Sequence, residues 1–415
     1  MIILAVSLGL LFYRLGVNTL SNWDEAWLAA VAQGGGWWNG EQWLYEPPLV
    51  TWVLSLMIKF SQSEWWLRSF NAASGVVLVM AVYWTGKKLF RSKLAGIMSA
   101  LVLLSTIEWL FRARQINVDI PLSLWLFLAI TWKSGLFLGL AAMTKRLSFL
   151  LAVPALVWAL RKKNWRRELG LFLLVVLPWH VYSYLILGKE FVDKYLLGFS
   201  LGKLTAVNPV TGSSPLFYIE ALRHGMKLWV LILPVAFLIW GLRQKTLLIF
   251  VATYLVGLTV SPIKASWYML PIYPLLALLI GGFLSQIFKH RRSWGLILVI
   301  AVFLFNLLRW RQEWLVPQTT LHQAALAKEV KAITKPDEVV YLDDDWLPVA
   351  VFYSQRKVIP LRFSRGERYN DPLNLPMGSL VLTNAETLGN LRQRLSGEIS
   401  EIKQNSDLLL VRIIP

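Results

Sequence analysis

Long apolar stretches alternate with short polar or basic loops over the first three quarters of the chain. Unpaired backbone groups cost several kcal/mol each in hydrocarbon, and these stretches are too continuous for barrel strands, so we expect membrane-spanning helices. The expected spans cover about 2–17, 68–86, 94–111, 120–132, 135–160 as two helices, 169–187, 226–241, 246–261, 268–288 and 294–309. The pattern predicts an all-α multi-span membrane protein with about eleven transmembrane helices.

Two apolar stretches differ from a simple membrane span. The apolar run 48–60 is too short to cross roughly 30 Å of hydrocarbon at about 1.5 Å per residue, so it is expected to lie in the interface or to re-enter from one side. The stretch 135–160 carries Lys145 and Arg146 near its middle. A charged pair is costly at the bilayer centre and tolerable at a helix end, which favours two helices that meet there.

The basic residues predict an orientation. The loops 87–93, 161–167, 243–245 and 289–292 hold 4, 5, 2 and 3 Lys and Arg residues. Eleven alternating spans place all four loops on one face, which is cytoplasmic by the positive-inside rule. The opposite, extracytoplasmic face then receives the loops around 21–66, 112–119 and 188–225, and the C-terminus. The predicted location is the plasma or inner membrane.

The last hundred residues change in character. They predict helices over 324–333, 347–354 and 386–395 and strands over 338–342, 357–361, 378–383 and 407–413, which is an α/β pattern. We expect a transmembrane domain over 1–312, with its first outer loop at about 18–66, and a small soluble extracytoplasmic α/β domain over 313–415. The run Asp343-Asp344-Asp345 is expected to be a solvated strand end.

Composition supports the membrane assignment and narrows the partners. The chain is 56% hydrophobic and 16% charged, its mean hydropathy is +0.53, and it contains no cysteine. Disulfides and thiolate metal sites are therefore excluded. The net charge of +18 comes from clusters between apolar spans, as in cytoplasmic loops, and predicts no nucleic-acid partner.

Adjacent carboxylates stand out in the first outer loop. Asp24 and Glu25 begin a helix-like segment, 24–32, for which Ser21 or Asn22 can serve as the cap. One interpretation is that both acids simply favour a helix N-terminus electrostatically. The other is that they are catalytic.

Short motifs follow the first span in a defined order. They are Asp24-Glu25-Ala26, Pro47-Pro48-Leu49, Ser63-Glu64-Trp65-Trp66-Leu67-Arg68, Arg114 through Asp119-Ile120-Pro121-Leu122, Gly139 through Thr144-Lys145, Pro178-Trp179, Ser261-Pro262-Ile263-Lys264, and Tyr268-Met269-Leu270-Pro271 with Pro274. Together they cover about 300 residues and resemble the GT-C glycosyltransferases, membrane enzymes that use polyprenyl-phosphate sugars. The chain looks like the branch that contains protein O-mannosyltransferases and the lipid A aminoarabinose transferase.

The resemblance implies an inverting glycosyltransferase that moves a sugar from a polyprenyl-phosphate carrier to an extracytoplasmic lipid, glycan or protein. Such a transfer needs a carboxylate that accepts the proton of the attacking hydroxyl. Asp24 matches the family's catalytic aspartate in the first loop, and Glu25 is placed to orient the acceptor or a cation. Asp119 matches the second acidic position of the family. Its alternative role is to cap the span that follows, ahead of Pro121.

The leaving phosphate needs positive or hydrogen-bond-donating groups. The candidate substrate-binding residues at the outer face are Lys145, Lys264, Arg112, Arg114, Lys203, Glu46, Tyr45 and Tyr268. A basic side chain that snorkels from a helix end is the alternative explanation for each cation. Most of the 22 tryptophans are expected at the membrane interface, and those best placed to stack on a sugar or prenyl chain are Trp23, Trp27, Trp37, Trp38 and Trp43.

Two departures from the family affect the cofactor. Relatives often carry Lys or His before the Pro-Pro pair, where this chain has Glu46, and many carry His-Asn where it has Gly198-Phe199-Ser200-Leu201. A zinc site like theirs is therefore not predicted, and a divalent cation stays open. Two other classes also stay open: a transporter or lipid-linked-sugar flippase, and a noncatalytic membrane scaffold. The expected partners are the lipid-linked donor, an extracytoplasmic acceptor and membrane lipids.

Overall fold

The computed structural model describes residues 1–38, 41–161, 165–201, 214, 216–241, 243–315, 320–361, 375–394 and 398–414. The chain forms two compact units. The helical unit comprises Met1–Leu15, Leu44–Val50 and Arg68–Pro317, and the mixed unit comprises Gly16–Trp43, Thr51–Leu67 and Gln318–Pro415. Most of the predicted outer loop thus belongs to the same unit as the C-terminal region, although more than 250 residues separate them in sequence.

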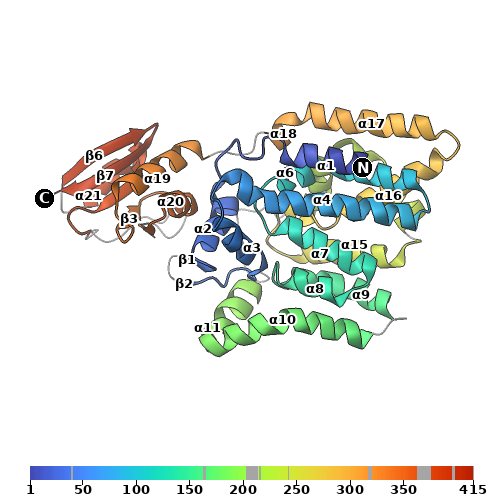
Figure 1. Cartoon of the computed structure of the whole chain (residues 1–415), viewed down its shortest axis with the longest axis horizontal. Helices are drawn as coiled ribbons and strands as arrows, with labels where there is room; N and C mark the ends of the chain where they lie inside the picture. The colour runs from blue at the N-terminus through green and yellow to red at the C-terminus, as the bar shows by residue number, and fades with distance from the viewer. Residues whose placement is uncertain are drawn as a thin grey trace. The chain divides into compact units, whose positions relative to one another are not determined.

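The helical unit is a bundle (Figure 1). Its described helices are α1 (Ile2–Phe12), α4 (Glu64–Leu89), α5 (Lys93–Leu104), α6 (Ile107–Ala113), α7 (Asp119–Trp132), α8 (Gly135–Ala142), α9 (Val153–Leu160), α10 (Trp165–Leu187), α11 (Lys189–Phe191), α13 (Phe217–Met226), α14 (Leu233–Ala236), α15 (Lys245–Val260), α16 (Tyr273–Ile287), α17 (Arg292–Arg309) and α18 (Arg311–Leu315). Among them, α4, α10 and α17 are long and apolar enough to cross a membrane.

Two of the expected spans are bent. The stretch 94–111 is divided into α5 and α6, whose axes differ by 74°, and the stretch 226–241 contains a bend of 78° between Phe217–Leu231 and Leu233–Gly241. Counting each bent pair as one span gives up to five spans by length and composition among the described residues. Further apolar helices are shorter than 18 residues, so the expected number of eleven stays a prediction.

Polar side chains stabilise the bend between α5 and α6. A break in a helix releases backbone groups that need new partners in apolar surroundings. Asn306 Nδ2 in α17 donates to the carbonyl oxygen of Ser105 at 3.3 Å, and Trp229 Nε1 donates to Ser105 Oγ at 2.8 Å. These partners come from distant parts of the sequence, and they fix the bend inside the bundle.

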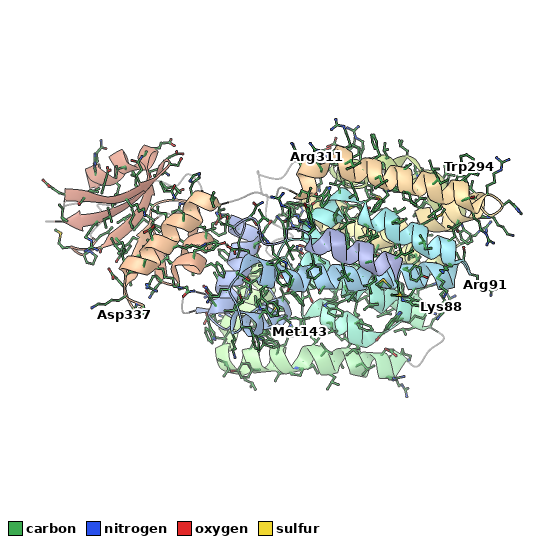
Figure 2. The ribbon with its side chains drawn as sticks, turned by 45° about the horizontal axis from the view of Figure 1, so that its top comes forward. Lys88, Arg91, Met143, Trp294, Arg311 and Asp337 are labelled. Carbon is green, nitrogen blue, oxygen red and sulfur yellow. The ribbon has the colours of Figure 1, made fainter. Side chains whose placement is uncertain are left out.

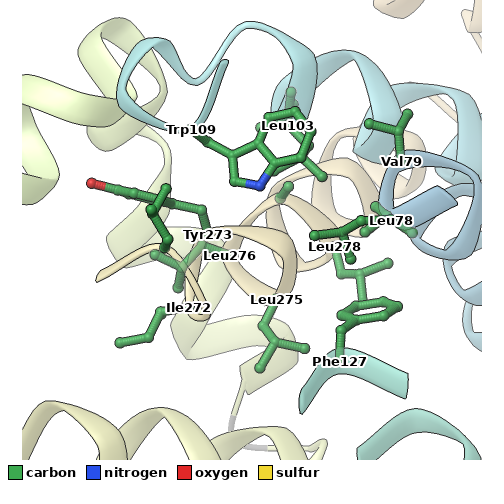
Figure 3. Close-up of a cluster of buried hydrophobic side chains, with 14 of the residues drawn as sticks. Leu78, Val79, Leu103, Trp109, Phe127, Ile272, Tyr273, Leu275, Leu276 and Leu278 are labelled. Carbon is green, nitrogen blue, oxygen red and sulfur yellow. The ribbon is translucent and has the colours of Figure 1, made fainter. Parts of the chain in front are cut away.

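The core of the helical unit lies where α5, α6, α7 and α16 meet. Trp109, Phe127, Tyr273 and Leu278 are at most 1% exposed, and Figure 3 shows them within one apolar cluster. Helices α5 and α16 approach closely because α16 carries Gly281, where an added Cβ would lie 2.2 Å from Ser99 Oγ. Small residues at such contacts allow the close backbone packing that is typical of membrane helices.

Two of the basic loops lie at one end of the helical unit. Lys88 is in the last turn of α4, Arg91 follows that helix, and Trp294 is in the first turn of α17, and Figure 2 shows all three labelled residues at that end. Met143, two residues before Lys145, lies toward the opposite end. This separation agrees with the charge pattern behind the predicted orientation, which itself stays a prediction.

The mixed unit combines the outer loop with a sheet. The loop contributes η1 (Asn22–Ala26), α2 (Trp27–Gln33), the antiparallel pair β1 (Trp37–Trp38) and β2 (Glu41–Gln42), and most of α3 (Leu49–Ile58). The C-terminal region contributes α19 (Leu321–Ile333), α20 (Leu347–Ser354), α21 (Ala385–Arg394) and the strands β3 (Val339–Leu342), β4 (Lys357–Pro360), β5 (Leu380–Asn384), β6 (Glu398–Asn405) and β7 (Leu408–Ile414). Helix α3 has ten residues and is too short to cross a membrane, as expected for the run 48–60.

The sheet has the order β4-β3-β5-β7-β6. Strand β3 is parallel to β4 and β5, whereas β7 is antiparallel to β5 and β6. The α/β pattern expected for the last hundred residues is confirmed, but β6 was not predicted. Strand β6 lies at the edge of the sheet, its side chains are mostly exposed, and its register is irregular between Glu401 and Lys403. Its sequence therefore lacks the strict alternation of apolar and polar residues by which a strand is predicted.

Candidate functional site

At the start of α7, one residue caps the helix and a different residue carries the charge. Asn117 Oδ1 accepts hydrogen bonds from the backbone N–H groups of Asp119 at 3.0 Å and Ile120 at 2.9 Å. These are among the donors that a helix N-terminus leaves without partners inside the helix. Because Asn117 makes the cap, the carboxylate of Asp119 is available for another partner.

That partner is Lys145, which follows α8. Lys145 Nζ lies 2.6 Å from Asp119 Oδ1 and 4.5 Å from the ring centroid of Tyr268. The two charged side chains are 15% and 8% exposed. The Asp119 carboxylate at this distance stabilises the charged, ammonium form of Lys145.

A second ion pair lies beside the first. Arg146 Nε is 3.4 Å from Glu46 Oε2, Arg146 Nη2 is 3.4 Å from Glu46 Oε1, and the guanidinium carbon lies 4.7 Å from the ring centroid of Tyr45. Both charged side chains are less than 10% exposed. The backbone N–H of Leu49 donates to the carbonyl of Met143 at 3.1 Å, which ties the Pro-Pro segment to the end of α8.

We call Glu46, Asp119, Lys145 and Arg146 the paired-charge cluster. Glu46, Lys145 and Arg146 line a cavity of about 290 Å³ with Tyr254, Ser261 and Tyr268. Its other walls are apolar and include Leu147, Leu150, Leu151 and Leu258. The cavity therefore offers cationic donors next to hydrocarbon, which suits a lipid with a phosphate head. Arg146 was not among the predicted binding residues, although its neighbour Lys145 was.

Two further predicted cations lie on the same unit. Lys264 Nζ donates to the carbonyls of Thr259 and Ser261, both at 2.9 Å, at the C-terminal end of α15. Its side chain thus interacts with a helix end that carries partial negative charge. Arg112 lies 4.4 Å from the ring centroid of Trp267 and 3.5 Å from Glu108 Oε1.

Arg114 is engaged at the end of α1. Its Nη1 donates to the carbonyl of Leu10 at 2.5 Å, and its Nη2 donates to the carbonyl of Tyr13 at 2.7 Å. Arg68 donates to the carbonyl of Leu15 at 3.0 Å, so two arginines satisfy carbonyls at and just beyond this helix end. These contacts give Arg114 a structural role. Lys203, the last predicted cation, lies outside the described residues.

In the mixed unit, the adjacent acids Asp24 and Glu25 have different surroundings. Asp24 is exposed, whereas Glu25 is fully buried and its Oε2 accepts the backbone N–H of Ser21 at 3.0 Å. The helical segment expected over 24–32 is present as η1 followed by α2. The expected side-chain cap by Ser21 is absent, and Asn22 is used elsewhere.

The C-terminal region holds the segment that precedes Asp24. The carbonyl of Asp345 accepts Asn22 Nδ2 at 2.6 Å and Trp23 Nε1 at 3.2 Å. The Tyr353 hydroxyl accepts the backbone N–H of Leu20 at 2.9 Å and donates to Glu64 Oε1 at 2.8 Å. No local pattern in the sequence predicts these long-range contacts.

The acidic run 343–345 is only partly solvated. Asp343 is 2% exposed and accepts a hydrogen bond from Thr383 Oγ1 at 3.4 Å, which corrects the expectation of a fully solvated strand end. Asp345 is exposed. Among the residues that the structure describes, no group of three or more His, Asp and Glu side chains is arranged to hold a metal ion.

Known structures share this architecture. The crystal structure of ArnT from Cupriavidus metallidurans bound to undecaprenyl phosphate aligns with a TM-score of 0.79 at 15% identity, over 99% of this chain and 97% of that chain. Its apo state aligns with a TM-score of 0.77. The chain therefore shares its fold with these ArnT structures. The oligosaccharyltransferase of Archaeoglobus fulgidus, solved with zinc and sulfate, aligns with a TM-score of 0.56 at 13% identity, over 100% of this chain and 73% of that chain.

Sequence comparison locates the likeness within the chain. Residues 45–183 match the family described as dolichyl-phosphate-mannose-protein mannosyltransferase. An uncharacterised protein of Aquifex aeolicus is 25% identical over 346 residues, which are 73% of this chain and 67% of that protein. The matched family segment contains all four members of the paired-charge cluster.

Proposed function

We propose that the protein transfers a sugar from a polyprenyl-phosphate carrier to an extracytoplasmic acceptor at the cell membrane, with inversion at the anomeric carbon. The observation that carries the proposal is the cavity that joins Lys145 and Arg146 to apolar walls. The fold is shared with an ArnT structure that holds undecaprenyl phosphate, a lipid of the required class. The phosphate head of such a lipid matches the cationic wall of the cavity, and its prenyl chain matches the apolar walls.

In this proposal, Lys145 and Arg146 stabilise the phosphate as it leaves. An ammonium and a guanidinium donate charge-assisted hydrogen bonds to phosphate oxygens. Asp119 and Glu46 hold these cations in place through the ion pairs at 2.6 and 3.4 Å. Tyr45 and Tyr268 lie against the cations, and Lys264 supports the loop that contributes Ser261.

Asp24 is proposed as the general base. Its carboxylate accepts the proton of the acceptor hydroxyl as the hydroxyl oxygen bonds to the anomeric carbon. The bond from that carbon to the phosphate oxygen breaks, and its electron pair stays on the phosphate. Attack opposite the leaving group inverts the carbon. Glu25, buried and bonded to the Ser21 backbone, is proposed to position the Asp24 segment.

A second candidate is a transporter or flippase for lipid-linked sugars. The two bent helix pairs favour it, because broken helices often form transporter binding sites. A flippase moves the intact lipid-linked sugar, whereas a transferase breaks the sugar–phosphate bond. The chemical fate of the donor therefore separates the two candidates.

The test uses purified protein, a radiolabelled undecaprenyl-phosphate sugar fraction, and membranes of a strain that lacks the gene as the acceptor source. We expect label to move to the acceptor fraction with release of undecaprenyl phosphate. Movement of intact donor across vesicle membranes without release of undecaprenyl phosphate would instead support the flippase. Mass spectrometry of envelope glycans with and without the gene identifies the sugar and the acceptor.

A further inference from the structure

A groove lined by both polar and apolar side chains lies within the mixed unit, formed by the first outer loop and the C-terminal region. It has a volume of about 570 Å³ and is lined by Gln33, Trp37, Gln62, Gln355 and Lys357, among others. This volume falls in the range of small-molecule sites, roughly 300–1,000 Å³. We refer to it as the Trp37 groove.

The sequence builds the aromatic wall of the groove with a glycine turn. Gly34, Gly35 and Gly36 follow α2, and the last two have φ values of +67° and +101°, a region that favours glycine. An added Cβ at Gly34 would lie 2.3 Å from the carbonyl oxygen of Trp37. The tight turn thus returns Trp37 toward the end of α2, where its side chain is 45% exposed.

The amide side chains of the groove are already oriented. Gln33 Nε2 donates to the carbonyl of Phe352 at 3.0 Å, and Gln355 Nε2 donates to Gln62 Oε1. The amide oxygens of Gln33 and Gln355 and the amide nitrogen of Gln62 therefore remain for a ligand. Amides fixed in this way offer both acceptors and donors, which is what a polyhydroxylated ligand requires.

Two cations line the groove, Arg356 and Lys357. Arg356 uses its guanidinium on the C-terminal end of α19, donating to the carbonyls of Lys331 at 3.0 Å and Thr334 at 2.7 Å. The exposed Lys357, by contrast, forms no ion pair with any residue in the described part of the chain. A ligand with an anionic group next to its hydroxyl groups would satisfy it.

We infer that the Trp37 groove binds a saccharide portion of the acceptor, stacked on Trp37, with an anionic substituent at Lys357. The inference rests on the proposed transferase function. Gln33 ends the helical segment that begins beside Asp24, and nine helical residues at about 1.5 Å each span roughly 13 Å. An acceptor held in the groove can therefore extend along α2 toward the proposed base.

The test measures how transfer depends on acceptor concentration. The purified protein receives a constant level of labelled undecaprenyl-phosphate sugar and increasing amounts of envelope glycan and lipid extract from the gene-deleted strain. We expect Trp37→Ala and Lys357→Ala each to raise the acceptor concentration at half-maximal rate about tenfold, as expected for loss of one aromatic or charged contact. Trp37→Phe retains the aromatic surface and is expected to behave like the wild type.

Trp52→Ala is the matched control, because Trp52 is 44% exposed on α3 and does not line the groove. Undecaprenyl phosphate binding by each variant is measured separately and is expected to be unchanged. Wild-type acceptor dependence in both Trp37→Ala and Lys357→Ala would overturn the inference, as would a lower maximal rate with unchanged acceptor dependence. Absence of transfer by the wild-type protein would contradict the proposed function itself, so the two failures are distinguishable.

Discussion

Lys145 Nζ lies 2.6 Å from Asp119 Oδ1, although 26 residues separate them, and the pair is largely buried. Removing one partner of a buried pair leaves a charge without compensation, which costs about 3–5 kcal/mol. We therefore expect Lys145→Met to lower the apparent melting temperature in detergent strongly. The double variant Lys145→Met/Asp119→Leu is expected to recover most of that loss, because neither charge remains.

A measurement of sugar transfer by the double variant separates this stability effect from a loss of function. The double variant is expected to stay folded and yet to lose transfer, since Lys145 no longer reaches the leaving phosphate. A double variant that transfers sugar like the wild type would remove Lys145 and Asp119 from the proposed mechanism. Equal instability of the single and double variants would show that the pair is not energetically coupled.

Arg146 and Arg114 give a second contrast. Arg146 lines the cavity beside Glu46, whereas Arg114 is bonded to carbonyls at the end of α1. Loss of a charge-assisted hydrogen bond costs about 1.5–3 kcal/mol, so Arg146→Met is expected to weaken undecaprenyl phosphate binding at least tenfold. Arg114→Met is expected to lower thermal stability with little effect on lipid affinity in the molecules that remain folded. The reverse pattern would exchange their assigned roles.

Tyr353 connects the C-terminal region to the segment before Asp24. Tyr353→Phe removes hydrogen bonds with Leu20 and Glu64, each worth about 0.5–1.5 kcal/mol. We expect a lower maximal transfer rate with unchanged donor affinity, because the position of Asp24 is less well defined. Tyr341→Phe, in strand β3 of the same unit, is the control. A wild-type maximal rate in Tyr353→Phe would show that these contacts do not position the base.

The sequence predicted the α/β region well because its signals are local. Helix α20 has the expected bounds Leu347–Ser354, and its neighbours agree within a few residues. Strand β6 escaped prediction because an exposed edge strand has little apolar alternation. The bend at Ser105 escaped because its stabilising partners, Trp229 and Asn306, are distant in sequence.

Residues of the candidate site could be predicted from the sequence, but the ion pairs that they form could not. Charge patterns suggested that Asp119 and Lys145 lie on one face, yet no local signal indicates which base each acid contacts. The same limit explains Arg114. A basic residue near a helix end can snorkel, bind phosphate or satisfy carbonyls, and only the three-dimensional arrangement around Leu10 and Tyr13 distinguishes these roles.

The most direct test of the proposed function is the transfer rate of Asp24→Asn with a labelled undecaprenyl-phosphate sugar and acceptor extract from the gene-deleted strain. Asp337→Asn, an exposed acid in the mixed unit, is the matched control. We expect no detectable transfer by Asp24→Asn, with normal membrane insertion and undecaprenyl phosphate binding, and wild-type transfer by Asp337→Asn. Wild-type turnover by Asp24→Asn would contradict the assignment of Asp24 as the general base.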